Sequence, residues 1–82
     1  MGTTDRKAIL ERVNAVFREI FDDESVEVFE ETTAADVEGW DSLRHITLIE
    51  AIEDEFGMRF QMNEVTGMKN VGEMLTIIAE RI

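Results

Sequence analysis

DSLRHITLIEAIEDEFG, residues 41–57, is the stretch of sequence that decides the fold of this chain. Its apolar side chains recur at steps of about three or four residues, the spacing of one face of an α-helix. These side chains are Leu43, Ile46, Ile49, Ile52 and Phe56, with Leu48 and Ala51 flanking the stripe. Asp41 stands where a helix N-cap belongs, and Gly57 stands where a left-handed residue ends a helix. The stretch therefore predicts an amphipathic helix that buries this stripe.

One further helix is predicted before this stretch and another after it. The earlier helix runs to about Phe21, with Thr3 or Thr4 as its cap and Asp5 at its positive end. Its apolar face consists of Ile9, Leu10, Val13, Val16, Phe17, Ile20 and Phe21. The later helix begins with Asn70 as N-cap, and Glu73 completes a variant of the capping box. Its apolar face consists of Val71, Met74, Leu75, Ile78 and Ile82.

Two connecting segments separate these helices. Residues 22–41 break the helical period, and we expect an ordered loop pinned by the isolated apolar side chains Val26, Val28, Phe29 and Val37. A short strand pair through Val26 and Val28 is the alternative for part of this loop. Residues 58–69 predict one short helical turn after Asn63, supported by Phe60, Met62, Val65 and Met68. The predicted fold is a single all-α domain over residues 1–82, a small helix bundle with a long first loop and a short third helix.

The composition excludes several classes of function. The 82 residues include 19 acidic and 8 basic side chains, a net charge of -11 that repels nucleic acid and anionic lipid and attracts basic proteins. The hydrophobic content of 44% is normal for a domain with a buried core and argues against disorder. The chain has no cysteine, so neither a disulfide nor a zinc thiolate can form. No stretch approaches the ~20 apolar residues that span a bilayer, and residues 1–12 lack the apolar run of a secretory signal. We expect a monomeric, cytoplasmic protein.

Asp41-Ser42-Leu43 opens the central helix after a long loop, and here the sequence resembles the acyl carrier protein family. The signature of that family is Asp-Ser-Leu at the start of the second helix of a four-helix bundle. The resemblance covers nearly the whole chain, because the order of helices and loops also matches. It implies a bundle of the acyl-carrier type with 4′-phosphopantetheine attached covalently to Ser42. It also implies that the chain carries an acyl group as a thioester and is itself no enzyme.

Physical chemistry agrees with an arm on Ser42. A serine in the first turn of a helix is open to a modifying enzyme, and the free N–H groups of that turn favour a phosphodiester anion. A chain without cysteine can carry a thioester only on a borrowed thiol. The structural alternative is that Ser42 is a plain capping residue, although Asp41 already suffices as a cap.

The resemblance also implies partners. They are a phosphopantetheinyl transferase and the acyl-loading and acyl-transferring enzymes of fatty-acid, polyketide or related biosynthesis, which dock through basic patches. The residues expected to contact them are Asp41, Leu43, Arg44, Glu50, Glu53 and Asp54. Arg44 and Thr47 depart from the family, because fatty-acid carriers often have acidic residues at both positions. With Trp40 and His45, these departures favour a carrier of a dedicated pathway.

Other functions remain as alternatives. The chain could be an aminoacyl or peptidyl carrier loaded by an adenylating ligase, or an unmodified acidic adaptor of basic partners. Ser42 and His45 are spaced to share a helical face as nucleophile and base, but no Gly-x-Ser-x-Gly elbow accompanies them. Asp22, Asp23 and Glu24 are adjacent rather than alternating, so no metal site is expected. The structural interpretation makes His45 a half-exposed helix residue and Trp40 a residue at the rim of the core.

Overall fold

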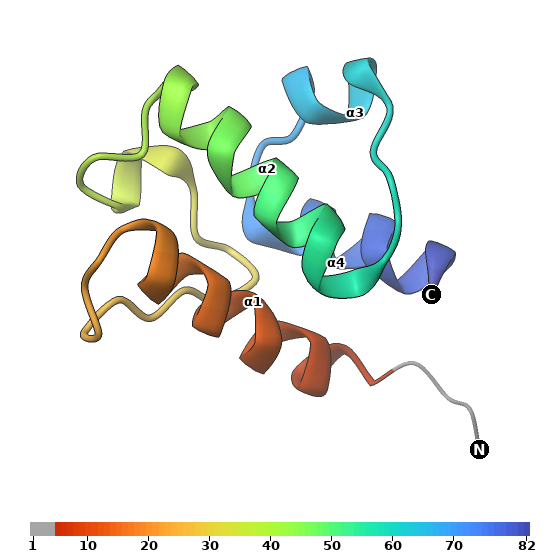
Figure 1. Cartoon of the computed structure of the whole chain (residues 1–82), viewed down its shortest axis with the longest axis horizontal. Helices are drawn as coiled ribbons and strands as arrows, with labels where there is room; N and C mark the ends of the chain where they lie inside the picture. Colours follow the sequence, from red (N-terminus) through yellow and green to blue (C-terminus); the bar gives the residue numbers. More distant parts are fainter. Residues whose placement is uncertain (1–4) are drawn as a thin grey trace.

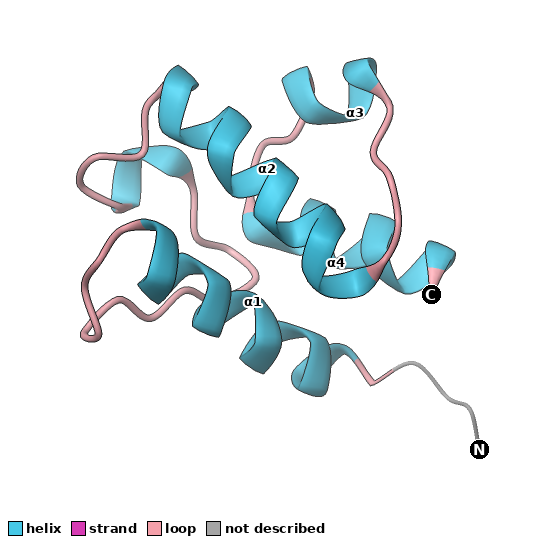
Figure 2. Ribbon diagram, viewed as in Figure 1, coloured by secondary structure: helices cyan, strands magenta, loops and turns pink. Residues whose placement is uncertain are grey.

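This computed structural model describes residues 5–82, which contain four α-helices and one turn of 3₁₀-helix (Figure 1). The elements are α1 (Arg6–Ile20), η1 (Ala34–Asp36), α2 (Ser42–Phe56), α3 (Met62–Thr66) and α4 (Val71–Arg81). No strand occurs among the described residues, so the strand pair through Val26 and Val28 was a wrong alternative (Figure 2). The all-α bundle with a long first loop and a short third helix is confirmed. No helix in residues 5–82 has the length and apolar character to cross a membrane.

Helix α1 packs against both α2 and α4 and presents its apolar face to the core. Ile9, Val13, Val16 and Phe17 are buried, as predicted. Its N-cap is Asp5, whose carboxylate accepts a hydrogen bond of 3.0 Å from the backbone N–H of Lys7. Asp5 therefore has the capping role that was expected of Thr3 or Thr4, and those two threonines lie outside the described residues.

Helix α2 begins and ends where the sequence predicts. The Asp41 carboxylate accepts a hydrogen bond of 2.8 Å from the backbone N–H of Arg44, and Gly57 ends the helix with a left-handed φ of 64°. The buried stripe was wrong at its start, because Leu43 is 78% exposed and Ile46 is 48% exposed. The buried side chains are Leu48, Ile49, Ile52 and Phe56. Leu43 and Ile46 lie on the outer face, at helical steps from Glu50.

The long loop between α1 and α2 is held by a buried polar side chain. The amide of Asn14 donates to the backbone oxygen of Val28 at 3.1 Å and accepts from its backbone N–H at 2.7 Å. Val28 is fully buried, and Val26 and Val37 pack against the core as expected. Phe29 was wrongly expected to pin the loop, since it is 50% exposed. Neighbouring residues of an extended segment point in opposite directions, so burial of Val28 turns Phe29 outward.

The last two helices are joined by an ion pair. Helix α3 begins at Met62, slightly before the predicted turn. The Glu64 carboxylate of this helix forms an ion pair of 2.6 Å with the Arg81 guanidinium of α4. Asn70 caps α4 as predicted by accepting from the backbone N–H of Glu73 at 2.9 Å. The predicted capping box is only half formed, because the Glu73 carboxylate accepts from the backbone N–H of Lys69 instead of that of Asn70. The apolar face of α4 is buried except for Ile82, which was wrongly included and is 51% exposed.

Candidate functional site

Ser42 is the first residue of α2, and its side chain is exposed. The first backbone N–H groups of a helix have no partner within the helix. Asp41 supplies acceptors for two N–H groups further along the helix. Its carboxylate accepts from the backbone N–H of Arg44, and its backbone oxygen accepts from that of His45 at 2.8 Å. Among the described residues, no acceptor bonds the N–H groups of Ser42 and Leu43. The hydroxyl of Ser42 thus stands beside two N–H groups that can face an anion.

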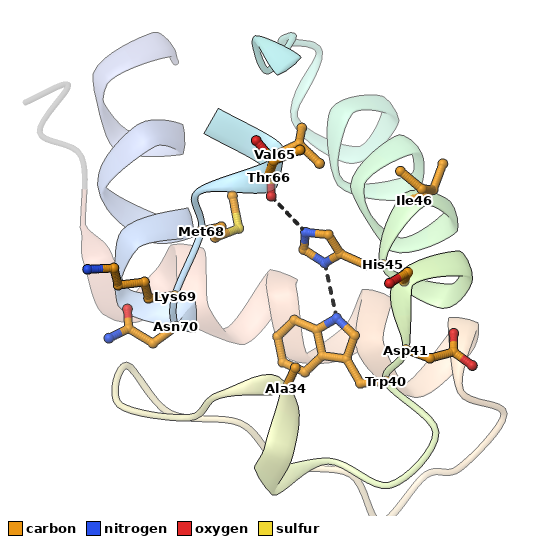
Figure 3. Close-up of a pocket in the computed structure, with 11 residues that line it drawn as sticks. Ala34, Trp40, Asp41, His45, Ile46, Val65, Thr66, Met68, Lys69 and Asn70 are labelled. Atoms are coloured by element: carbon orange, nitrogen blue, oxygen red, sulfur yellow. Dashed lines mark hydrogen bonds between the residues drawn. The ribbon is translucent and has the colours of Figure 1, made fainter. Parts of the chain in front are cut away.

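A groove of about 460 Å³ adjoins Ser42 (Figure 3). Its walls come from η1, from the first turns of α2 and the two residues before that helix, from the end of α3 and from the residues that link α3 to α4. Apolar side chains supply much of the lining, among them Trp40, Ile46, Val65 and Met68. Sequence reasoning missed Val65 and Met68 as groove residues and gave them only a role in a helical turn. No local signal was available, because Val65 belongs to α3 whereas Met68 lies in the link that follows it.

Hydrogen bonds join His45 to both sides of the groove (Figure 3). The indole N–H of Trp40 donates to Nδ1 of His45 at 3.0 Å, and Nε2 of His45 lies 3.2 Å from the backbone oxygen of Val65. Because an indole N–H can only donate, Nδ1 must be the acceptor, and the ring proton belongs on Nε2. Both ring nitrogens are therefore engaged away from Ser42. This arrangement argues against His45 as a general base for Ser42.

Trp40 covers the edge of the core, as the structural interpretation predicted. It is half-buried, and its ring meets that of Phe17 edge-on with 5.1 Å between ring centroids. Its indole N–H has a partner in His45, which a partly buried indole requires. Trp40 thus connects the core directly to the groove.

Arg44 points away from the groove and holds the end of α1. Its guanidinium donates to the backbone oxygen of Ile20 at 2.8 Å and lies 5.4 Å from the ring centroid of Phe21. A cation is favoured at the C-terminus of a helix, where carbonyl groups lack partners. The first turn of α2, which carries Ser42, is therefore tied to α1 by Arg44 and to α3 by His45.

The acidic residues of α2 divide into two groups. Glu50 and Asp54 are exposed, and neither forms an ion pair within residues 5–82. Glu53 is half-buried, and its carboxylate accepts from the backbone N–H of Phe60 at 2.8 Å. Glu55 pairs with Arg12 at 3.0 Å. Of the acidic residues of α2 predicted to contact partners, Glu50 and Asp54 face solvent on the same helical side as Leu43, whereas Glu53 holds the segment between α2 and α3.

The acidic run after α1 forms a turn. The carboxylate of Asp23 accepts from the backbone N–H of Ser25 at 2.9 Å and from its hydroxyl at 2.6 Å. These bonds to the Ser25 hydroxyl and backbone hold the pKa of Asp23 below its ordinary value. Within residues 5–82, no three His, Asp or Glu side chains gather in a way that could hold a metal ion.

Similar chains occur among known proteins. The sequence is 32% identical over 78 residues to an acyl carrier protein of Saccharopolyspora erythraea, covering 95% of this chain and 82% of that protein. The structure resembles the solution NMR structure of a holo acyl carrier protein from Geobacter metallireducens, with a TM-score of 0.83 and 34% sequence identity. That match covers 89% of this chain and 84% of the other. No family model matches the sequence.

Proposed function

Since the chain belongs to the acyl carrier protein family, we propose that it carries an acyl group as a thioester on a 4′-phosphopantetheine arm attached to Ser42. When bound, the arm supplies the thiol that a chain without cysteine lacks. The residues around Ser42 fit this group. The hydroxyl is exposed, two backbone N–H groups are available for the phosphodiester, and an apolar-lined groove adjoins the attachment point.

The observation that carries this proposal is the division of roles between Asp41 and Ser42. Asp41 alone supplies the capping bond of α2, with its carboxylate 2.8 Å from the N–H of Arg44. Ser42 makes no side-chain hydrogen bond among the described residues, so the fold does not require its hydroxyl as a cap. A hydroxyl that is exposed and structurally unused at a helix start is available for modification.

The outer face of α2 is the proposed docking surface for partner enzymes. It consists of Asp41, Leu43, Arg44, Glu50 and Asp54, which are all exposed. Its net negative charge fits a transferase and acyl-loading or acyl-transferring enzymes that have basic patches. Glu53 acts on this face only indirectly, because its carboxylate is bonded to the backbone of Phe60. Arg44 gives the face a positive charge next to Ser42, which favours enzymes of a dedicated polyketide or related pathway.

We further propose that residues 1–82 act as one monomeric carrier unit in the cytoplasm. A single core cluster formed by α1, α2, α4 and the long loop supports the first part. The absence of cysteine suits a reducing compartment. The tether then keeps the cargo at a high effective concentration near successive enzymes, and those enzymes catalyse the reactions.

Intact mass spectrometry tests the attachment. The apo protein, incubated with a phosphopantetheinyl transferase and coenzyme A, should gain the mass of one arm. Ser42→Ala should remain folded and gain nothing, whereas Ser25→Ala, which changes the only other serine, should gain the arm like wild type. An unmodified wild type with several transferases would support the acidic adaptor instead. The mass of cargo on protein from native cells would separate an acyl carrier from an aminoacyl or peptidyl carrier.

A further inference from the structure

Helix α3 has two side-chain links to other helices within residues 5–82. On one side, Glu64 bonds Arg81 of α4. On the other side, His45 of α2 lies with Nε2 at 3.2 Å from the backbone oxygen of Val65. The last backbone oxygens of a helix lack a partner within it, and Val65 is the penultimate residue of this five-residue helix. His45 therefore fills a need that α3 cannot meet itself, and does so on the side that faces the groove.

The position of His45 is fixed in turn by Trp40. A histidine free to rotate could lose the bond to Val65, but the indole N–H of Trp40 donates to Nδ1 at 3.0 Å. The two rings are tilted against each other with 5.8 Å between centroids, and Trp40 is anchored on Phe17 in the core. The bond from Trp40 also selects the tautomer, because an occupied Nδ1 acceptor leaves the proton on Nε2 for Val65.

We propose that His45 is a positioning residue that clamps α3 against α2 and so fixes the groove in which the cargo end of the arm on Ser42 rests. The clamp itself follows from the geometry of the free protein, and the role toward cargo rests on the proposed function. Ile46 lines the groove from α2, and Val65 lines it from α3. The bond from the ring of His45, the residue before Ile46, to the backbone oxygen of Val65 holds these two walls at their separation. A short apolar acyl group lying between these walls is shielded from water.

The clamp is tested first in the unmodified protein. His45 is the only histidine, so ¹⁵N labelling of histidine gives the ring signals of this residue alone. Wild type should show Nδ1 as an unprotonated acceptor and the ring proton on Nε2. In His45→Phe, amide hydrogen exchange in α3 should rise about tenfold, the effect of losing roughly one hydrogen bond of ordinary net strength. His45→Gln keeps one acceptor and one donor on a planar group and should restore much of the protection.

The role toward cargo is tested by loading wild type and variants with a hexanoyl-phosphopantetheine arm. Hydroxylamine attacks the thioester carbonyl, releasing the free thiol of the arm and a hydroxamate, so its rate reports how exposed the thioester is. His45→Phe should be cleaved severalfold faster than wild type, and His45→Gln should fall between them. Glu64→Gln is the matched control, because it removes the ion pair in the other link of α3 and leaves the clamp in place.

The outcomes separate the two proposals. A proton on Nδ1, or unchanged exchange of α3 in His45→Phe, would overturn the clamp. Equal cleavage in wild type and His45→Phe, or equally fast cleavage in Glu64→Gln, would show that His45 has no specific role toward cargo. If no arm attaches to Ser42, the proposed function fails, and the tautomer and exchange measurements still decide the clamp.

Discussion

The guanidinium of Arg44 donates a hydrogen bond of 2.8 Å to the backbone oxygen of Ile20, so the start of α2 holds the end of α1. This contact gives Arg44 a role in the fold at a position where the family often has an acidic residue. An acidic side chain at position 44 would place a negative charge at the negative end of α1 and would have no N–H group to donate to the backbone oxygen of Ile20. The departure from the family pattern therefore matches a local structural need.

Loss of the Arg44 contact should destabilise the protein moderately. Arg44→Ala removes the bond to Ile20 and the contact with the Phe21 ring, and should lower the free energy of unfolding by about 1 kcal/mol. Urea unfolding followed by circular dichroism measures this. Arg59→Ala is the control, because the Arg59 side chain is exposed and makes no hydrogen bond among the described residues. An equal loss in both variants would mean that Arg44 acts only through net charge.

The corrected register of α2 predicts opposite behaviour for two isoleucines. Ile52 is fully buried, and Ile52→Ala should lower the free energy of unfolding by about 2–4 kcal/mol, a severe loss for a small domain. Ile46 is 48% exposed, and Ile46→Ala should have a much smaller effect. Thermal unfolding of the two variants compares them directly. Similar losses in both would support the register that places Ile46 in the core.

Sequence patterns predicted the helices well because their signals are local. Asp41, Gly57 and Asn70 cap or end helices through contacts a few residues away, and all were predicted correctly. The buried side of α2 was harder, since its apolar residues form two periodic sets. Leu43 and Ile46 continue toward Glu50 on one face, whereas Leu48 and Ile52 continue toward Phe56 on another. Only packing against α1 and the other elements decides between the two faces.

The groove could not be predicted, because it depends on residues far apart in the chain. Ser42 was found from a local motif, but the bond between His45 and Val65 spans 20 residues. The same holds for Asn14, whose polar side chain lies on the apolar side of α1 and was not singled out. Its amide donates locally to the backbone oxygen of Leu10, but its two other hydrogen bonds go to the backbone of Val28, which lies 14 residues away.

Asn14 should be among the most sensitive polar residues. Asn14→Ala leaves the buried N–H and oxygen of Val28 without partners and should cost about 2–4 kcal/mol, since each unsatisfied group costs about 1–3 kcal/mol. Chemical denaturation provides the measurement. Asn63→Ala is the matched control, because the Asn63 side chain is exposed and has no bond within residues 5–82. Equal stability of Asn14→Ala and wild type would show that water replaces the amide at Val28.

Acid should weaken the link between α3 and α4. The hydrogen bonds from Arg81, and then that from the backbone of Gln61, hold the pKa of Glu64 below its ordinary value. A lowered folded-state pKa means that the pair stabilises the protein fully above the unfolded-state pKa, about 4.3 for glutamate, and loses this effect as pH falls through the folded-state value. Glu64→Gln should therefore flatten the fall of melting temperature with acid. An unchanged slope would mean that other carboxylates, such as Glu30 beside Arg6, account for the acid sensitivity.

The exposed carboxylates of α2 should steer partner enzymes. Glu50 and Asp54 lack ion pairs within the described residues, so reversing both to lysine removes attraction without breaking a contact in the fold. The rate of arm transfer at low substrate concentration should fall, and the difference from wild type should shrink with salt as the Debye length drops from ~10 Å at 0.1 M to ~3 Å at 1 M. A double reversal of Glu11 and Glu80 is the control, because it changes net charge equally at exposed positions on α1 and α4. If both double variants slowed arm transfer equally, the overall net charge, and not the charge on the outer face of α2, would govern the encounter with the transferase.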